Sequence, residues 1–475
     1  MKTPLSSKKI VLDLNMKPIQ LKDADPSNYD AIIAGGGAGG LLTGLSLTNE
    51  GKRVLVLEKA DRLGGVWHSY WIDGYRVDNG LHVITRVKTG AFARFMRTYL
   101  SPPPEFILHD GWYFRVNDKV GTIPTSIGET LRWPLTGLRG RFGLARIGAK
   151  IKTMKLDEMK KYKDISFLDF MKSRGATNQV MLDVMQSAIY MAAGVGIEKA
   201  SAYEALRTLK DTDKESTKLE SAKRLLFGTQ DYDEGYVLGG MEGLIRRVIE
   251  AIDGDYVLNA PVEKIHESNG EVVGLTVAGN RVEHKCIISN IPLWAMNKIV
   301  ASDSEANARF FEKWSNIVPT HGLTVWLGLD RVIIGDRKNR VLVHPNPNRW
   351  IVSISSFDPS SAPEGKELVA IAMMSIPGKT VQEQVDILKG NGLEEYYPGL
   401  LENIEMEHVQ SSYATRAQLI PGQTDLDRPG PKTPIKGLYI VGTDTAGSGV
   451  GLQQAANSAE GVVAAMKADR ALSFD

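Results

Sequence analysis

The sequence predicts an α/β protein with a Rossmann-type domain and a discontinuous second domain built from a mixed sheet and helices. Three observations support this fold class. A strand–helix–strand pattern occupies residues 30–58. Two further segments of the same type begin near residues 236 and 437, far away along the chain. Finally, a chain of 475 residues exceeds the size at which one hydrophobic core usually divides, so we expect two domains.

The first unit reads as a buried strand, a helix and a second buried strand. Asp30–Ala34 is short, apolar and stops at glycine, which is typical of a buried strand. A helix is expected from Gly39 to about Asn49, with leucines supplying its apolar content. The near-continuous apolar run 53–58 predicts the second strand. Together these elements form a βαβ unit.

The later segments extend the same domain. Residues 236–241 lead into an amphipathic helix, and strand-like runs follow at 256–259, 262–265, 272–277 and 285–289. Residues 437–442 predict a strand that ends in a glycine-rich loop, followed by a helix to about Lys467. We therefore assign residues 29–100, 236–300 and 411–475 to the Rossmann-type domain.

The remaining residues form the discontinuous second domain and an extension. Residues 1–28 are polar and predict an N-terminal extension or an edge strand. Residues 101–235 are basic and predicted to be helical. Residues 301–410 are mixed, with strand-like runs at 323–329, 341–343, 350–355 and 368–374. The second domain is thus expected to comprise 101–235 and 301–410.

Composition limits the class of protein. Apolar residues make up 43% of the chain, charged residues 24%, and the net charge is +1. These values exclude a disordered chain and give no global electrostatic reason to expect nucleic-acid binding. The single cysteine, Cys286, lies in an apolar run and is expected to be a small core residue, so no intramolecular disulfide or cysteine metal site is expected.

The N-terminus lacks the apolar core of a signal peptide, and no stretch reads as a transmembrane helix. We therefore expect a cytoplasmic protein that is soluble or attached to a membrane surface.

A glycine pattern follows the first strand and opens the first helix. Gly35, Gly37 and Gly40 provide G-x-G-x-x-G, in which the glycines allow a tight turn, close approach to a pyrophosphate and close helix–strand packing. The helix N-terminus offers free N–H groups to the phosphates. Glu58, at the end of the second strand, is placed to accept a ribose hydroxyl. The alternative for Glu58 is a solvated carboxylate at the strand end.

The residues after Glu58 identify the nucleotide. Arg62-Leu63-Gly64-Gly65 resembles the FAD-binding sequence of the amine oxidase and phytoene desaturase superfamily. Residues 74–82 resemble the family's strand and turn beside the flavin ring, and 236–243 with 259–262 resemble the segment whose valine meets the adenine. Residues 437–451 resemble the C-terminal flavin motif, although its last helix departs from the usual Ser-Gly pair at 458–461.

The resemblance implies non-covalent FAD and a set of contact residues. Arg62 would lie near the phosphates or the ribityl chain, with a surface cation as the alternative, and Asp444 would accept from the ribityl chain. The implied cofactor contacts are Gly35, Gly37, Ala38, Gly39, Gly40, Glu58, Lys59, Arg62, Gly64, Gly65, Val66, Leu81, His82, Val262, Gly442, Asp444, Gly451 and Leu452.

No second dinucleotide fingerprint is present, so a dedicated NAD(P)H domain is not expected. The electrons would pass to oxygen, a quinone or another carrier, or the reaction would be redox-neutral. The sequence shows neither a Ser/His/Asp constellation nor metal-ligand spacing. Covalent flavin attachment through Cys286 is not expected, because this residue is far from the flavin motifs in sequence.

Residues 131–155 form a basic amphipathic segment. They contain seven Lys or Arg residues and no acid, alternating with Trp, Leu, Phe and Ile. This pattern suits a peripheral position on anionic lipid, and family resemblance favours it. The alternative is a solvated cationic face packed on the second domain.

A hydride can be exchanged with the flavin only if the reacting bond is held against it with water excluded, so an apolar slot is required. Tyr190 and Trp326 are candidates for its wall, with simple core packing as the alternative. His82 could donate or accept a proton beside the flavin, or could be a hydrogen-bonded turn residue.

The leading hypothesis is a phytoene desaturase-like oxidoreductase that exchanges hydride between FAD and a C–C bond of an isoprenoid or other lipid. Saturation, desaturation and redox-neutral isomerisation of a polyene all use this scaffold. An amine oxidase is an alternative, which would need an aromatic pair near the flavin; Tyr413 and Tyr439 are present without being placed as that pair. A third hypothesis is a non-catalytic protein that resembles escorts of prenylated GTPases, although those lack an intact FAD fingerprint.

Overall fold

The computed structural model describes residues 16–80, 83–124, 126–176, 178–210, 233–335, 340–390 and 392–473, with the side chains of 412–415 excepted. The predicted site residues Leu81 and His82 lie outside these ranges, and so does the side chain of Tyr413.

A six-stranded parallel sheet forms the base of the molecule. Its strands come from distant parts of the chain, as the sequence predicted. Their spatial order is β1 (Met16–Pro18), β11 (Gly254–Val257), β3 (Val54–Leu57), β2 (Ala31–Ala34), β15 (Ile287–Ser289) and β22 (Leu438–Ile440). The N-terminal stretch therefore supplies an edge strand, β1.

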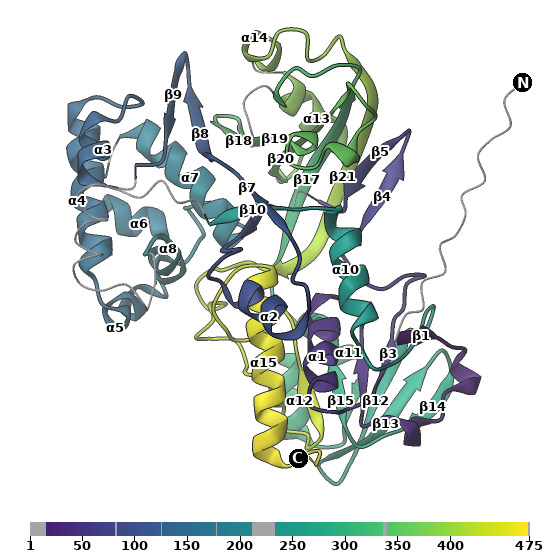
Figure 1. The fold of residues 1–475 in the computed structure, drawn as a ribbon. Coiled ribbons are helices and arrows are strands. Elements are labelled where there is room, and N and C mark those ends of the chain that lie inside the picture. The colour runs from purple at the N-terminus through teal and green to yellow at the C-terminus, as the bar shows by residue number, and fades with distance from the viewer. Residues whose placement is uncertain are drawn as a thin grey trace, which may run out of the picture.

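Different layers cover the two faces of this sheet, because successive side chains of a strand point to opposite sides. Ile33 and Val56 pack against helices, whereas Ile32 and Leu55 pack against a second, smaller sheet. The helices are α1 (Ala38–Thr48), α2 (Ala91–Tyr99), α10 (Gly240–Glu250) and α15 (Leu452–Asp469), visible together in the lower half of Figure 1. The smaller sheet contains β14 (Asn280–Glu283), β13 (Glu271–Val277), β12 (Val262–Ser268) and β16 (Val300–Ala301), with α11 (Leu293–Ile299) and α12 (Glu305–Glu312) beside it.

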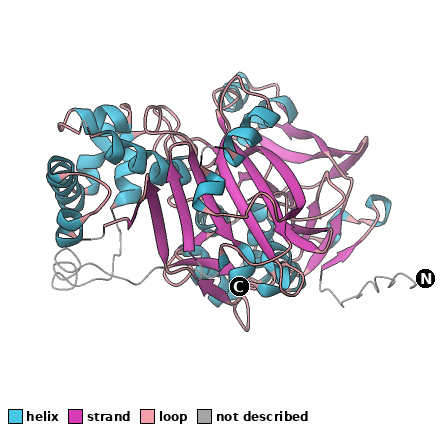
Figure 2. Ribbon diagram, turned by 90° about the horizontal axis from the view of Figure 1, so that it is seen from above, coloured by secondary structure: helices cyan, strands magenta, loops and turns pink. Residues whose placement is uncertain are grey.

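A seven-stranded mixed sheet forms the second domain (Figure 2). Its neighbouring strands are antiparallel, except for one parallel pair, β18 and β8. The spatial order is β21 (Ile404–Ala417), β17 (Pro319–Leu329), β20 (Glu367–Met374), β19 (Asn348–Ser353), β18 (Arg340–Pro345), β8 (Gly111–Val116) and β9 (Lys119–Thr122). Helices α13 (Val381–Lys389) and α14 (Leu393–Tyr396) pack on one face.

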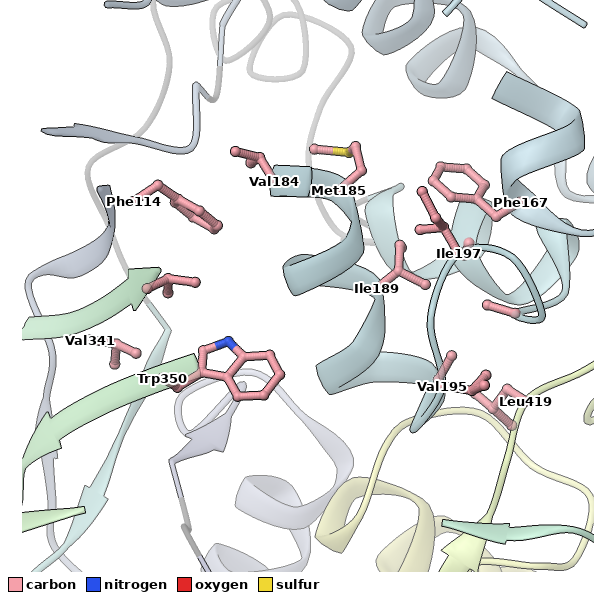
Figure 3. Packing of buried hydrophobic residues seen from close by; sticks show 14 of the residues in the cluster. Phe114, Phe167, Val184, Met185, Ile189, Val195, Ile197, Val341, Trp350 and Leu419 are labelled. Carbon is pink, nitrogen blue, oxygen red and sulfur yellow. The ribbon is translucent and has the colours of Figure 1, made fainter. Parts of the chain in front are cut away.

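The other face of this sheet packs against a group of helices. In Figure 3, Phe114, Val341 and Trp350 extend from the sheet, opposite Met185 and Ile189 of α7. The Asn178 side chain caps the start of α7, and Gly194, with φ of 69°, ends it in the left-handed conformation that glycine tolerates. The helices are α3 (Ile127–Arg132), α4 (Leu138–Thr153), α5 (Leu156–Met159), α6 (Phe167–Lys172), α7 (Gln179–Ala193) and α8 (Ala202–Leu209).

Short elements join the two domains. A hairpin of β4 (Ser69–Ile72) and β5 (Tyr75–Asp78) lies beside β21, and a three-stranded sheet contains β6 (Ile84–Thr85), β10 (Glu234–Val237) and β7 (Phe106–Leu108). The short 3₁₀ helices are η1 (Leu21–Asp23), η2 (Pro26–Asn28), η3 (Lys160–Tyr162), η5 (Ile354–Ser356) and η6 (Pro359–Ser361).

Two details of the predicted organisation need correction. The segment 101–235 is not helical from its start, because it opens with β7, β8 and β9. In β8, Trp112, Phe114 and Val116 pack on one face of the sheet and Tyr113 packs on the other, as expected of a strand. The boundary placed between 410 and 411 falls inside β21, which pairs with β17 along most of its length. This strand lacks a continuous apolar run, since it lies at the edge of its sheet. We move the boundary to follow Ala417, and the other domain limits stay predictions.

Candidate cofactor and substrate site

The glycine loop between β2 and α1 has no room for side chains. Gly35 has φ of +102°, a conformation that favours glycine. A Cβ added at Gly40 would lie 2.3 Å from the carbonyl oxygen of Gly35 and 3.0 Å from a methyl group of Ile33, so this glycine lets helix and strand approach each other. Gly37 is the N-cap of α1, and the main-chain N–H groups of the helix start remain available to an anion.

A second glycine segment packs on the first. The Gly64 N–H donates to the Gly36 carbonyl over 2.7 Å, and a β-bridge joins Gly37 and Gly64. A Cβ added at Gly65 would lie 3.4 Å from the Gly37 Cα. We call residues 35–40 together with 64–65 the glycine cradle. Its close-packed main chain has the glycine pattern of a pyrophosphate loop, and binding of a dinucleotide there stays a prediction.

Glu58 is held against the cradle and is 6% exposed. One carboxylate oxygen accepts the Gly36 N–H over 2.8 Å, and the other accepts the Ala60 N–H over 2.8 Å. The alternative of a freely solvated carboxylate is therefore wrong. Each oxygen retains a second lone pair, so the group can still accept a hydroxyl hydrogen; its binding to ribose stays a prediction.

Asn290 packs against the glycine cradle and was not predicted from the sequence. It follows β15, and its side-chain amide lies so close to the loop that a Cβ at Gly37 or Gly39 would come within 2.7 or 2.6 Å of it. The available signal was its position: a polar residue directly after a buried parallel strand lies at the carboxyl edge of the sheet, where ligands of such folds bind.

The C-terminal motif completes this edge. The main-chain N–H of Leu293 donates to the Asp444 carboxylate, and burial raises the pKa of this carboxyl group above its usual range. The Gly442 N–H donates to the Ser458 hydroxyl over 3.1 Å, so Ser458 ties α15 to the end of the motif strand. Gly451, with φ of +56°, is the N-cap of α15, which begins at Leu452.

The remaining predicted cofactor residues differ in exposure. Lys59 and Arg62 are exposed, and the Arg62 guanidinium lies 5.9 Å from the ring centre of Tyr70. Val66 is 40% exposed, and Ala38 is partly buried at the start of α1. Val262 is partly buried and begins β12. No contact among the described residues assigns these positions to a cofactor.

A buried polar network lies beneath the stretch 74–80. The Asp78 carboxylate accepts the Tyr236 hydroxyl over 2.7 Å and the Ser69 hydroxyl over 2.5 Å. The side chain of Gln410, from β21, bonds to the main chain of Asp78 and Gly80. Sequence reasoning quoted Asp78 within a motif but missed Gln410, because β21 had not been recognised.

The predicted substrate residues lie on one face of the seven-stranded sheet. The ring of Tyr190 stacks on Trp350 with centroids 5.2 Å apart, and its hydroxyl donates to the His321 carbonyl over 2.9 Å. Burial raises the pKa of the Tyr190 phenol to about 12, so it stays protonated at neutral pH. Trp326 is fully buried and donates its indole N–H to Gln410 over 2.9 Å.

The floor between these aromatic residues is built from small and polar residues of neighbouring strands. Thr324 lies across from Gln410 and Ala372 in the neighbouring strands, on the same face as Trp326. Gly322 lies two residues before Thr324 on the same face of β17, and the nearest atom to a Cβ added there would be 4.0 Å away. Gly322 therefore leaves open space next to this strand.

Arg416 is a further residue of this face that sequence reasoning did not single out. Its guanidinium donates to the carbonyl oxygens of Met191 and Ala192, each over 2.7 Å, at the C-terminal end of α7. Burial lowers the pKa of Arg416 to about 10, which leaves it cationic at neutral pH.

The described residues lack two other features. Nowhere in these ranges do three or more His, Cys, Asp or Glu side chains converge in a way that could hold a metal ion. None of the helices in the same ranges has both the length and the apolar character needed to cross a membrane.

A glycine loop at the carboxyl edge of a parallel sheet, joined to a second domain, is an arrangement typical of dinucleotide-dependent oxidoreductases. A known protein family matches most of the chain. Residues 38–467 match the family of flavin-containing amine oxidoreductases. The chain belongs to this family and is a flavin-dependent oxidoreductase.

Individual relatives show how far the similarity extends. The chain is 24% identical to the chloroplastic prolycopene isomerase of Arabidopsis thaliana over 486 aligned residues, covering 89% of this chain and 80% of that protein. A stretch of 71 residues is 41% identical to the all-trans-retinol 13,14-reductase of Rattus norvegicus, but covers 15% of this chain and 12% of the reductase.

Solved structures share the fold at low identity. An oxidoreductase from Methanosarcina mazei superposes with a TM-score of 0.72 at 22% identity, covering 92% of this chain and 99% of that one. A putrescine oxidase bound to putrescine gives a TM-score of 0.69 at 14% identity, with 94% and 99% coverage.

Proposed function

We propose that this protein is an FAD-dependent oxidoreductase that exchanges a hydride with a C–C bond of a large apolar substrate, an isoprenoid or another lipid. The observation that carries the proposal is the face formed by Tyr190, Trp350 and the small residues of β17, which is tied to the cofactor side through Gln410. The names of the retinol reductase and the prolycopene isomerase support a polyene or similar substrate.

FAD would be bound without a covalent link. The glycine cradle would hold the pyrophosphate, Glu58 a ribose, and Asp444 the ribityl chain, while the start of α15 would face the flavin. Bound FAD would supply a centre that accepts or donates hydride. Cys286 is buried in the core under the six-stranded sheet, and burial raises the pKa of its thiol to about 12, so it does not offer a thiolate for flavin attachment.

The residues of the chain would mainly position the substrate and exclude water from it, and would contribute less through acid–base chemistry. Protonated Tyr190 can donate a hydrogen bond but cannot act as a base at neutral pH. The aromatic residues and α7 would keep water from the reacting carbon atoms. His82 stays a hypothesis as the proton donor or acceptor, because it lies outside the described residues.

The cofactor half of the proposal is tested by the purified protein itself. We expect a flavin absorbance spectrum, release of FAD by acid or heat, and a polypeptide that is colourless after denaturation. A polypeptide that remains yellow would contradict non-covalent binding. Protein that contains no flavin and takes up none would refute FAD dependence.

The substrate half is tested by extracting gently purified protein with organic solvent and analysing the extract by mass spectrometry. A long-chain isoprenoid or other lipid would support the proposal. The redox-neutral alternative, isomerisation of a polyene, is distinguished by recovery of a product with the mass of its substrate. An extract that contains only polar amines would favour the second candidate, an amine oxidase, for which the putrescine oxidase fold is the supporting observation.

A peripheral membrane contact through residues 131–155 is part of the same proposal. Its apolar residues separate into two groups: Trp133 and Ile147 are buried in the core, whereas Leu138 and Phe142 are 67% and 63% exposed. Exposed arginines, among them Arg139, flank these two side chains. An apolar pair with adjacent cations suits the surface of an anionic bilayer from which an apolar substrate could be taken.

A further inference from the structure

Gln410 makes four hydrogen bonds from one buried side chain. Its oxygen accepts the Trp326 indole N–H over 2.9 Å and the Gly80 N–H over 2.8 Å. Its nitrogen donates to the Tyr70 hydroxyl over 2.6 Å and to the Asp78 carbonyl over 2.8 Å. Gln410 is 7% exposed; its bonds to Trp326 and Asp78 are buried, and those to Gly80 and Tyr70 are partly buried.

The direction of these bonds is fixed by chemistry. An indole N–H and a main-chain N–H can only donate, so the Gln410 oxygen must face Trp326 and Gly80. Its nitrogen must then face the two acceptors. The Tyr70 hydroxyl accepts from Gln410 and can donate its own hydrogen to the His408 Nε2, 2.8 Å away. Burial lowers the pKa of His408, which keeps this ring neutral and able to accept.

The same side chain joins the two domains at the predicted flavin. Trp326 belongs to β17 of the seven-stranded sheet. Asp78 and Gly80 belong to the stretch 74–82 that is expected beside the flavin ring. The carboxylate of Asp78 accepts from Tyr236 and Ser69. Its main chain pairs with Ser69 in the β4–β5 hairpin, and Gln410 adds a bond to this main chain from the seven-stranded sheet.

We propose that Gln410 is a positioning residue: it fixes the main chain of residues 78–80 against the flavin and thereby ties the flavin environment to the substrate-facing sheet. This inference rests on the proposed FAD site. A glutamate at this position would still accept from Trp326 and Gly80, but it would have no hydrogen for Tyr70 and would repel the Asp78 carbonyl.

The test compares holoenzymes carrying Gln410→Glu and Gln410→Leu with the wild type and with a matched control. The control is Gln384→Leu, because Gln384 is also a buried glutamine (5% exposed) that bonds main-chain groups, but it lies in α13 on the opposite side of the sheet. We expect both Gln410 variants to weaken FAD binding about tenfold and to change the visible circular dichroism of the bound flavin. The control should lower the unfolding temperature and leave both flavin readouts at wild-type values.

Two failures can be told apart. Wild-type protein that binds no FAD would overturn the proposed function. Wild-type protein that binds FAD, with Gln410 variants that match it in FAD affinity and flavin dichroism, would overturn the positioning role, even if those variants unfold at lower temperature. Should Gln410→Leu fail to fold, Tyr70→Phe replaces it: removing this one hydroxyl should shift the flavin dichroism in the direction of Gln410→Glu, and an unchanged spectrum in both would refute the inference.

Discussion

The two sheets of this protein carry their functional groups in different ways. In the six-stranded sheet, the candidate cofactor site is mainly main chain: the glycine cradle, the start of α1 and the start of α15 present N–H groups at one edge. In the seven-stranded sheet, the candidate substrate site is built from side chains of strands and helices that are far apart in sequence, such as Tyr190, Trp326 and Gln410.

This difference has a physical origin. A dinucleotide has the same phosphates and riboses in every protein that binds it, and main-chain donors in a fixed loop geometry recognise them. An apolar substrate is held by shape, and many combinations of side chains provide the same shape. We therefore expect single changes at the cradle to act sharply and changes at the substrate face to act gradually.

The largest effect is expected for Gly40→Ala. The added methyl group would lie 2.3 Å from the Gly35 carbonyl oxygen, which belongs to the main chain and has little freedom to move. We expect the free energy of unfolding to fall by about 3 kcal/mol and FAD to be lost. Denaturant titration and flavin content measure these changes. The control is Gly143→Ala within α4, where nothing lies within 4 Å of the new methyl group and a gain of about 1 kcal/mol is expected. Equal effects of the two substitutions on stability and flavin content would contradict the expected sensitivity of the cradle.

The next effect is expected for Glu58→Ala, which removes the acceptor of the Gly36 and Ala60 N–H groups and the predicted ribose partner. FAD affinity should fall about tenfold to a hundredfold. Glu367→Ala is a matched control, because Glu367 is also buried and accepts the N–H groups of Ile333 and Ile334, but in the other domain. It should lower stability with no change in the FAD affinity of the folded protein. A Glu58 variant that retains FAD normally would refute the ribose assignment.

Asp444→Asn is expected to have a smaller effect. It should raise the stability of the flavin-free protein and weaken its binding of FAD. Burial raises the pKa of Asp444 in the folded state, so the carboxyl group contributes most favourably below its unfolded pKa, and this contribution is lost as pH rises through the folded pKa. At neutral pH the flavin-free variant should therefore unfold at a slightly higher temperature than the wild type, and the difference should vanish as pH falls toward 4. FAD should bind more weakly to the variant. A variant that is less stable at neutral pH would contradict this account.

The smallest effect on the fold is expected at the exposed apolar pair of α4. Leu138→Ser with Phe142→Ser should leave the free energy of unfolding within about 0.5 kcal/mol of the wild type. Binding to vesicles that contain an anionic phospholipid should fall at least about tenfold, because both side chains would leave the bilayer. Val332→Ser with Val381→Ser removes two exposed apolar side chains from other elements and should not change vesicle binding. Wild-type protein that does not bind such vesicles would refute the membrane contact.

Local sequence patterns were sufficient to predict much of the domain that contains the glycine cradle. The strand, glycine loop and helix at 30–49 appear within one or two residues of their predicted bounds, since each glycine and each buried leucine acts on its immediate neighbours. The strand β21 was missed because polar residues such as His408 and Gln410 alternate with its apolar ones at the edge of the sheet, so no apolar run marks it. Asn290 was overlooked because its role depends on where β15 ends relative to the loop.

By itself, the sequence determined the fold class, the family resemblance and the glycine loop with Glu58, because these depend on contacts between residues near in sequence or on a motif that one ligand imposes. Only the tertiary structure decided that Glu58 is buried against the loop, that Gln410 joins residues 78–80 to Trp326, and that the apolar residues of 131–155 divide between core and surface. These features depend on the pairing of distant strands and on the packing of α4. Such packing is fixed by the total burial of the chain rather than by any short pattern within it.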